Sequence, residues 1–154
     1  MQCAVQPYFS KGISLAGLLE WILRQTGPAE VMVSTFSTSE EFLRRMARFK
    51  SMGMVTKCSL FCDLRAARKT TVLAHFIKGV FDKVALCQNH SKVMLVSNDS
   101  FRVAVVTSQN QTRGDRFEAG IITTNQSTFF NLRLGFDRLA ENSMSVDVLF
   151  RGND

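Results

Sequence analysis

The sequence predicts an α/β protein in which helices cover both faces of a mixed β-sheet. Segments of helical period alternate with short apolar runs in the first half, an order that predicts βαβ units with parallel strands. Two β-rich runs farther along flank a short polar turn, so a hairpin should add antiparallel strands. Hydrophobic residues make up 45% of the 154 residues, which is enough for a sizeable core, and we expect a single domain over 1–154.

The expected elements follow from apolar spacing and from capping residues. Leu15, Leu19 and Ile22 lie at helical spacing, and the Gly-Pro pair at 27–28 ends that helix. A hydroxyl cap at 37–39, followed by two acids, begins the next helix. The expected helices cover 13–26, the cap at 37–39 through about residue 51, 65–81 and 126–142, and the expected strands cover 30–36, 56–62, 83–88, 91–96, 101–106 and 117–123.

Net charge and composition limit the ligands and the cellular compartment that we expect for this chain. The net charge is +6 and the isoelectric point is near 9.5, a balance that favours polyanionic partners, including nucleic acid or an anionic membrane surface. Of the nucleic acids, we expect DNA rather than RNA. The N-terminus lacks the charged start and apolar run of a secretory signal. No run of about 18 apolar residues is present. We therefore expect a cytoplasmic protein with reduced thiols and no stable membrane association.

The residues suited to chemistry lie near the ends of three strand-like runs in the second half. His90 and Lys92 stand two apart where a strand is expected to begin, and alternate side chains of a strand share a face, so both should point into one pocket. Ser108 and Asn110 follow the next strand at the same spacing and can donate hydrogen bonds to phosphate oxygens. Glu118 lies in the following apolar strand, where a carboxylate can fix the tautomer of His90. An imidazole beside a fixed cation suits phosphate-ester chemistry.

This pattern resembles that of the phospholipase D superfamily, which has His-x-Lys, four further residues, Asp, a Gly-Ser-x-Asn turn after the next strand, and then a strand bearing Glu. The segment 90–92, His-Ser-Lys, matches the first part. The segment 107–110, Thr-Ser-Gln-Asn, matches the turn with Thr in place of Gly, and Glu118 matches the acidic residue. Ser97 occupies the Asp position, with Asp99 two residues on. The order of elements also fits, so the resemblance covers about the whole chain and implies a phospholipase D-like fold.

The resemblance implies an assembly and a mechanism. Active sites of the superfamily use two motifs about a two-fold axis, whereas this chain carries one, because His75 lies in an expected helix with no matching segments after it. A homodimer is therefore implied, as in the short bacterial endonucleases of the superfamily. His90 of one subunit would form a phosphohistidine while that of the other protonates the leaving oxygen. Lys92, Ser108 and Asn110 would stabilise the phosphoryl oxygens, and no metal or other cofactor is expected.

Other interpretations exist for these residues. His90 and Lys92 can also be a solvent-facing pair at a strand edge. A zinc site is another possibility, because thiolates and imidazoles bind zinc and the chain has Cys58, Cys62, Cys87 and His90. The first two would lie roughly 13 Å apart on an extended strand, which is too far for one ion and favours buried free thiols.

Two kinds of basic segment are candidate nucleic-acid contacts. Arg113 and Arg116 lie in the polar loop after Asn110, at the border of the expected pocket, where they can grip flanking phosphates. The run 42–50 interleaves basic and apolar residues, and a solvated basic helix face explains it equally well. The same two interpretations apply to the basic cluster at 65–69.

Two classes of function remain. The first is a phosphodiesterase, which the basic charge indicates is a nuclease and which the resemblance implies works without a metal. The second is a catalytically inactive phospholipase D-like fold that serves as a nucleic-acid-binding or protein-interaction module, and it is favoured by the departures at Ser97 and Thr107. A lipid substrate is a weaker third option, because no membrane-binding segment stands out.

Overall fold

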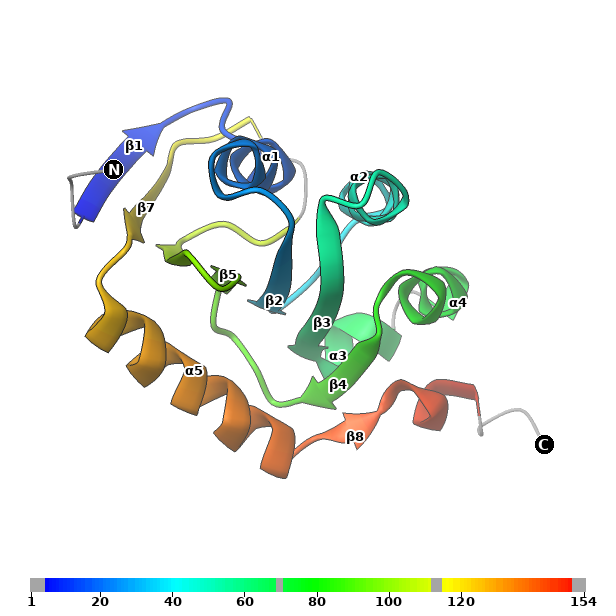
Figure 1. The fold of residues 1–154 in the computed structure, drawn as a ribbon. Helices are drawn as coiled ribbons and strands as arrows, with labels where there is room; N and C mark the ends of the chain where they lie inside the picture. Colours follow the sequence, from blue (N-terminus) through cyan, green and yellow to red (C-terminus); the bar gives the residue numbers. More distant parts are fainter. Residues whose placement is uncertain (1–4, 69–70, 112–114, 151–154) are drawn as a thin grey trace.

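The computed structural model describes residues 5–68, 71–111 and 115–150, and these form an eight-stranded mixed sheet with helices on both faces. The strands are β1 (Val5–Ser10), β2 (Ala29–Thr35), β3 (Val55–Asp63), β4 (Lys83–Cys87), β5 (Val93–Ser97), β6 (Arg102–Thr107), β7 (Glu118–Thr123) and β8 (Met144–Ser145), and the helices are α1 (Leu15–Thr26), α2 (Glu40–Ser51), α3 (Leu64–Arg68), α4 (Thr71–Val80), α5 (Gln126–Glu141) and the 3-10 segment η1 (Val146–Phe150). The strand order is β1-β7-β6-β5-β2-β3-β4-β8. Figure 1 shows α1, α2 and α4 over one face and α5 across the other, which confirms the expected fold class.

The pairing pattern changes at β2. β2, β3 and β4 run parallel because helical crossovers join them, whereas β5, β6, β7 and β1 pair antiparallel. The expected hairpin of β5 and β6 is confirmed. The register brings the carboxyl ends of β2, β3, β4 and β6 to the same edge of the sheet as the amino ends of β5 and β7. We call this edge the site edge, and it carries the segments 36–38, 63–65, 88–92, 107–111 and 115–118.

Capping and apolar spacing explain the helices locally. The hydroxyls of Ser14 and Ser39 cap α1 and α2, accepting hydrogen bonds from the N–H groups of Gly17 at 3.0 Å and Phe42 at 3.2 Å. The apolar faces of these helices then pack on the sheet, so that each face of the sheet has its own core. The larger core, under α1, α2 and α4, includes Leu19, Ile22, Leu43, Met46 and Leu60, and the smaller core, under α5, includes Phe61, Phe129 and Phe136.

The structure corrects the expected elements at several points. The helix expected over 65–81 consists of α3 and α4. The sequence did not predict β1, whose Pro7 cannot donate to a ladder and is tolerated because β1 is an edge strand paired with β7 alone. β5 begins at Val93 rather than at residue 91, so His90 and Lys92 precede the strand. In the described ranges, none of the helices combines the length and hydropathy that crossing a membrane requires.

Candidate active site

Backbone hydrogen bonds at the site edge bring together the segments that carry the expected catalytic residues. The N–H of Thr107 donates to the carbonyl of Lys92 at 3.1 Å, and the N–H of Ser108 donates to the carbonyl of Ala119 at 2.9 Å. The first bond fastens the segment before β5 to the end of β6, and the second fastens the end of β6 to the start of β7. The three segments therefore lie side by side.

A direct contact, rather than strand alternation, aligns His90 with Lys92. Lys92 Nζ lies 3.4 Å from His90 Nδ1 and donates to the His90 carbonyl at 2.9 Å. The His90 ring also meets the ring of Phe36 at a tilt of 50°, with the centroids 5.3 Å apart. His90 itself is exposed. The site edge thus presents an imidazole and an ammonium group together to solvent.

Buried polar groups support the segment that carries His90. The side chain of Asn89 donates to Ser34 Oγ at 2.8 Å and to two backbone carbonyls of β2 and β3. Its oxygen accepts from the N–H and the hydroxyl of Ser91, at 2.9 and 2.6 Å. Both ends of this buried amide are therefore paired, so the segment has one favoured position above the sheet.

Asp63, at the end of β3, completes this support. It is 2% exposed, and its two oxygens accept from the N–H of Asn89 at 3.0 Å and from the N–H of Arg65 at 2.9 Å. Burial raises the pKa of the Asp63 carboxyl, but the two N–H donors and the Arg65 guanidinium outweigh it, so the net pKa lies below the ordinary value. A hollow of about 480 Å³ opens above this carboxylate and is lined by Asp63, Leu64, Arg65, Gln88, Asn89 and His90.

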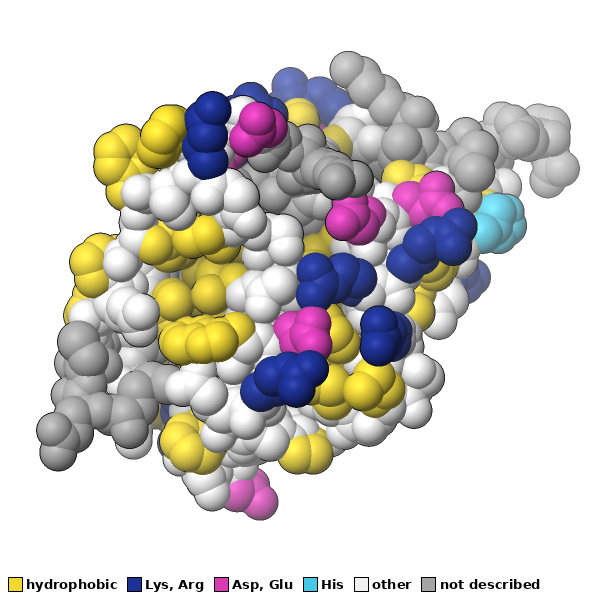
Figure 2. Space-filling view, turned by 90° about the horizontal axis from the view of Figure 1, so that it is seen from above, with side chains coloured by type: hydrophobic (Ala, Val, Ile, Leu, Met, Phe, Trp, Pro, Cys, Tyr) yellow, Lys and Arg dark blue, Asp and Glu magenta, His cyan; other side chains and the backbone are white. Residues whose placement is uncertain are grey.

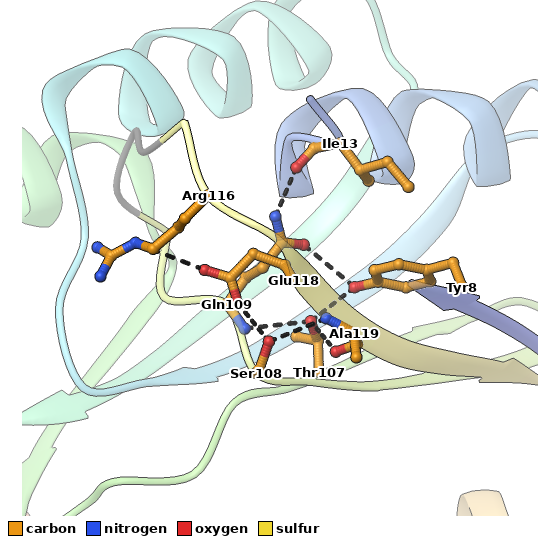
Figure 3. A network of polar contacts seen from close by, with 8 residues as sticks. All are labelled: Tyr8, Ile13, Thr107, Ser108, Gln109, Arg116, Glu118 and Ala119. Carbon is orange, nitrogen blue, oxygen red and sulfur yellow. Dashed lines mark hydrogen bonds and ion pairs between the residues drawn. The ribbon is translucent and has the colours of Figure 1, made fainter. Parts of the chain in front are cut away.

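The other half of the site is a cluster of exposed and partly covered polar groups (Figure 3). Glu118 accepts a hydrogen bond from the Ser108 hydroxyl, and its second oxygen lies 3.8 Å from Arg116 Nε. The Ser108 hydroxyl also accepts from the N–H of Ala119 at 3.1 Å. The side chain of Arg116 is 74% exposed and that of Glu118 only 18%. The carboxylate is therefore partly covered, while the guanidinium that pairs with it lies in solvent.

Tyr8 holds the end of β6 beneath this cluster. Its hydroxyl lies 2.6 Å from Thr107 Oγ1 and donates to Gln109 Oε1 at 3.1 Å (Figure 3). Burial raises the pKa of Tyr8 more than the Thr107 bond lowers it, and the charge of Glu118 raises it further. Thr107 stands where the resembled superfamily has glycine. No non-glycine residue of the described ranges has a positive φ, so the turn at Thr107 needs no glycine.

A cleft of about 450 Å³ opens beside Glu118, between the β1–α1 connection, the start of α2 and the loop after β6. Two buried side-chain atoms of that loop, Asn110 Oδ1 and Gln111 Nε2, have no hydrogen-bond partner among the described residues. Buried polar atoms are normally paired, so this loop has unused hydrogen-bonding capacity next to the cleft. The lining comprises Gly12, Ile13, Ser14, Leu15, Ala16, Ser39, Glu41, Phe42, Ser108, Gln109, Asn110, Gln111, Asp115, Arg116 and Glu118.

The expected site residues are divided between these two cavities. Ser108, Asn110, Arg116 and Glu118 line the cleft, whereas His90 lines the hollow over Asp63. Among the described residues Glu118 is paired with Ser108 and Arg116, and its expected bond to His90 stays a prediction. Arg113 lies outside the described residues.

Two further positions bear on the motif. Ser97, at the expected Asp position, ends β5 and pairs with Glu30 and Arg102, so roughly 15 Å of strand separates it from the site edge. Asp99 lies in the exposed turn beyond it. His75 lies on α4, where its ring centroid is 4.5 Å from that of Phe150.

The basic face of α2 is largely engaged in ion pairs, a finding that favours the solvated helix face over a nucleic-acid surface. Exposed pairs of this kind contribute little to stability but do occupy the cations. Arg44, Arg45 and Lys50 pair with Glu40, Glu20 and Asp82 at 2.5, 2.7 and 3.1 Å, respectively.

The cysteines of the described ranges are buried free thiols, as expected. Burial raises the pKa of Cys58 to about 11 and that of Cys62 to about 12, and it also raises the pKa of Cys87. They are therefore protonated at neutral pH and act as small apolar groups. Within the same ranges, no three or more His, Cys, Asp and Glu side chains gather as a metal site requires.

Solved structures show the same fold. NucT from Helicobacter pylori superposes with a TM-score of 0.69 at 12% identity, covering 92% of this chain and 99% of its own. Nuc from Salmonella typhimurium, a phospholipase D family member, superposes with a TM-score of 0.65 at 16% identity, covering 92% and 96%. Phosphatidylserine synthase from Haemophilus influenzae has a TM-score of 0.62 at 15% identity, covering 92% and 39%. No protein-family model and no curated protein matches the sequence. The phospholipase D-like fold that the motifs implied is confirmed.

Proposed function

We propose that this chain is a phosphodiesterase of the phospholipase D type that cleaves nucleic acid without a metal, and that two copies of the chain complete its active site. The observation that carries the proposal is the direct contact of His90 with Lys92 at the site edge, which also carries Ser108, Asn110 and Glu118, in a fold shared with a phospholipase D family member. Fold alone does not imply function, so these side chains, and not the fold, support a phosphodiesterase.

In the proposed reaction, an imidazole nitrogen of His90 attacks phosphorus. A P–N bond forms, the P–O bond to the leaving oxygen breaks, and the partner's His90 gives that oxygen its proton. Water then attacks the phosphohistidine, loses a proton to the partner's His90, and breaks the P–N bond. Lys92 lies 3.4 Å from the attacking ring, where its ammonium group stabilises charge on the phosphoryl oxygens.

The cleft beside Glu118 supports the role given to the residues after β6. Asn110 Oδ1 and Gln111 Nε2 are buried without a partner among the described residues. A base edge offers a donor to the first and an acceptor to the second, and a phosphate oxygen can accept from the second. Ser108 is bonded to Glu118 through an exposed contact. When substrate enters, that hydroxyl can turn to a phosphoryl oxygen, which frees the carboxylate to orient an imidazole.

The departures from the resembled motif are compatible with this proposal. Ser97 lies at the opposite end of β5 from His90, where Asn98 shapes the hairpin by accepting hydrogen bonds from the N–H groups of Ser100 and Phe101. Thr107 replaces the turn glycine without a positive φ and bonds to Tyr8. Neither departure removes a group that the proposed chemistry uses.

The alternative is a binding module that lacks catalysis. It is favoured by one observation: Glu118 is occupied by Ser108 and Arg116, while His90 lies over a different cavity. Such a module would bind nucleic acid through its cations and leave phosphodiesters intact.

Hydrolysis of bis-p-nitrophenyl phosphate in the presence of EDTA separates the two functions. We expect the wild type and His75→Ala to release p-nitrophenol in chelator, and His90→Ala to release none, because the covalent step needs the imidazole. His75→Ala is the matched control, since it removes the same side chain from α4. A wild type that binds DNA but cleaves no phosphodiester would support the binding module instead.

A further inference from the structure

Two phenylalanines near the site-edge ends of β1 and β7 are exposed to an extent unusual for their type. Phe9 on β1 is 76% exposed and Phe117, next to the start of β7, is 62% exposed. Their ring centroids lie 5.7 Å apart at 61°, an edge-to-face pair. Lys11 Nζ lies 5.5 Å from the centroid of Phe117. We call these three residues the aromatic platform.

The platform adjoins the candidate active site along the chain and in space. Phe117 directly precedes Glu118, and Lys11 directly precedes Gly12, and both of these neighbours line the cleft. Ser10, between Phe9 and Lys11, is the β1 partner of Glu118 in the sheet register. In the space-filling view, exposed hydrophobic side chains gather toward the β1 side of this face, and mixed charges toward α2 and α4 (Figure 2). By strand alternation Phe9 and its partner Ala119 face the α5 side of the sheet, as Ala104 does, whereas Glu118 faces the cleft. A nucleic-acid strand that leaves the cleft over the ends of β1 and β7 would therefore meet the platform on the other side of these strands.

From this combination we propose that the platform binds unstacked bases of single-stranded nucleic acid and guides the strand into the cleft. Aromatic faces bind bases of any sequence, and nearby cations attract the phosphates between them. The bases of a duplex are stacked on one another, so their faces are not available to Phe9 and Phe117. The proposal deepens the proposed function: it rests on nucleic acid as the substrate and names single strands as the preferred class.

Charge favours this ligand over a second copy of the chain. An isologous contact through the platform would bring Lys11 of one copy toward Lys11 of the other, in a chain whose net charge is +6. A polyanion meets the same cations with opposite charge. The platform is therefore assigned to the ligand, and the interface between copies to another surface.

The test compares the binding of a fluorescein-labelled single-stranded oligonucleotide with that of its duplex by anisotropy. Stacking is worth roughly 1–3 kcal/mol per base, so Phe9→Ala with Phe117→Ala should weaken single-strand binding by about tenfold or more. Duplex affinity and the hydrolysis of bis-p-nitrophenyl phosphate should change by less than about twofold, because neither uses the platform. Phe9→Trp with Phe117→Tyr should retain single-strand affinity, since these rings still stack.

Phe130 provides the matched control. It is 49% exposed on α5 and has Arg102 Cζ 5.2 Å from its ring centroid, so it is also an exposed aromatic beside a cation, but near the amino end of β6 and away from the site edge. Phe130→Ala should leave single-strand binding unchanged. An equal loss with Phe130→Ala, an equal loss for single strand and duplex, or a loss of dimer without a loss of single-strand affinity would each overturn the platform. A wild type that binds no nucleic acid would overturn it as well, even if the small phosphodiester is hydrolysed. If the wild type cleaves nothing but shows the platform effect, the proposed catalysis fails and the platform stands.

Discussion

The two halves of the candidate active site are held in place in different ways. Beneath His90, Asn89 and Asp63 form buried hydrogen bonds to the ends of β2 and β3. Around Glu118, the contacts with Ser108 and Arg116 lie at or near the surface. The difference indicates that the first half has a fixed position, whereas the second can change partners when a ligand arrives.

The energies of the two kinds of contact differ in the same direction. A buried donor or acceptor left without its partner costs about 1–3 kcal/mol, whereas an exposed ion pair is worth less than about 1 kcal/mol. A nucleophile benefits from a fixed position, because misplacement by about 1 Å can cost on the order of 10²-fold in rate. Groups that must release one another to bind phosphate benefit from weak mutual contacts. Each half is therefore suited to its proposed part in the reaction.

The largest expected effect follows from the proposal that Glu118 releases the Ser108 hydroxyl and orients an imidazole when substrate binds. Glu118→Gln should lower turnover of a phosphodiester by on the order of 10²-fold or more, because an amide orients the imidazole poorly and cannot stabilise its charged form. The free energy of unfolding should change by less than about 1 kcal/mol. Steady-state kinetics and urea unfolding measure the two quantities. Asp115→Asn, which also removes a carboxylate from the cleft lining, is the control, and equal losses in both variants would remove Glu118 from the site.

The next effect tests the fixed half. Asn89→Ala should lower the free energy of unfolding by about 2–3 kcal/mol, since it leaves several buried groups of β2 and β3 without partners. Ser108→Ala, in the exposed cluster, should lower it by less than about 1 kcal/mol. Urea unfolding of both variants measures the contrast. Similar losses in the two would contradict the view that the halves differ in rigidity.

A smaller effect should appear in the pH dependence of stability. The pKa of Asp63 is lower in the folded chain than in the unfolded one, so its carboxylate stabilises the fold above the ordinary pKa of Asp, about 3.9. This contribution should vanish as the pH falls through the lower folded-state value. Urea unfolding should therefore show the wild type more stable than Asp63→Asn at neutral pH, with the gap closing below about pH 4. If the difference in free energy of unfolding between wild type and Asp63→Asn instead grew in acid, the ionised carboxylate would destabilise the folded chain.

The smallest effect is the reactivity of the thiols beneath His90. The pKa of Cys62 is raised to about 12, and the thiol of Cys87 donates to the Cys62 carbonyl at 3.8 Å. Alkylation by iodoacetamide at neutral pH should be slow in the native wild type and complete in denaturant. Asn89→Ala should speed labelling, because the region above these thiols opens more often. Mass spectrometry of timed samples follows the reaction, and fast labelling of the native wild type would show that this half is not fixed.

Local patterns in the sequence predicted much of the fold. Apolar spacing and the Ser39 cap located α2, and the two β-rich runs around 97–100 predicted the hairpin. β1 was missed because its residues alternate poorly and Pro7 weakens the strand signal, and only pairing with β7 makes it a strand.

The candidate site was predictable only where its residues form a short motif. The spacing of His90 and Lys92, and of Ser108 and Asn110, is visible along the chain. The supports are not, because Asn89 meets Ser34 across 55 positions and Tyr8 meets Thr107 across 99. Contacts of that range depend on the strand order of the sheet, which the sequence patterns did not specify.

The central claim is that His90 is the nucleophile, and trapping the covalent intermediate tests it most directly. Wild type mixed with a phosphate-labelled substrate in EDTA and quenched in alkaline denaturant should carry label in the peptide that contains His90, since phosphohistidine survives alkali and is lost in acid. The dimer should carry one label at most, because the partner's His90 serves as the acid. Label that is absent from this peptide while the wild type turns over, or turnover by His90→Ala at the wild-type rate, would contradict the account.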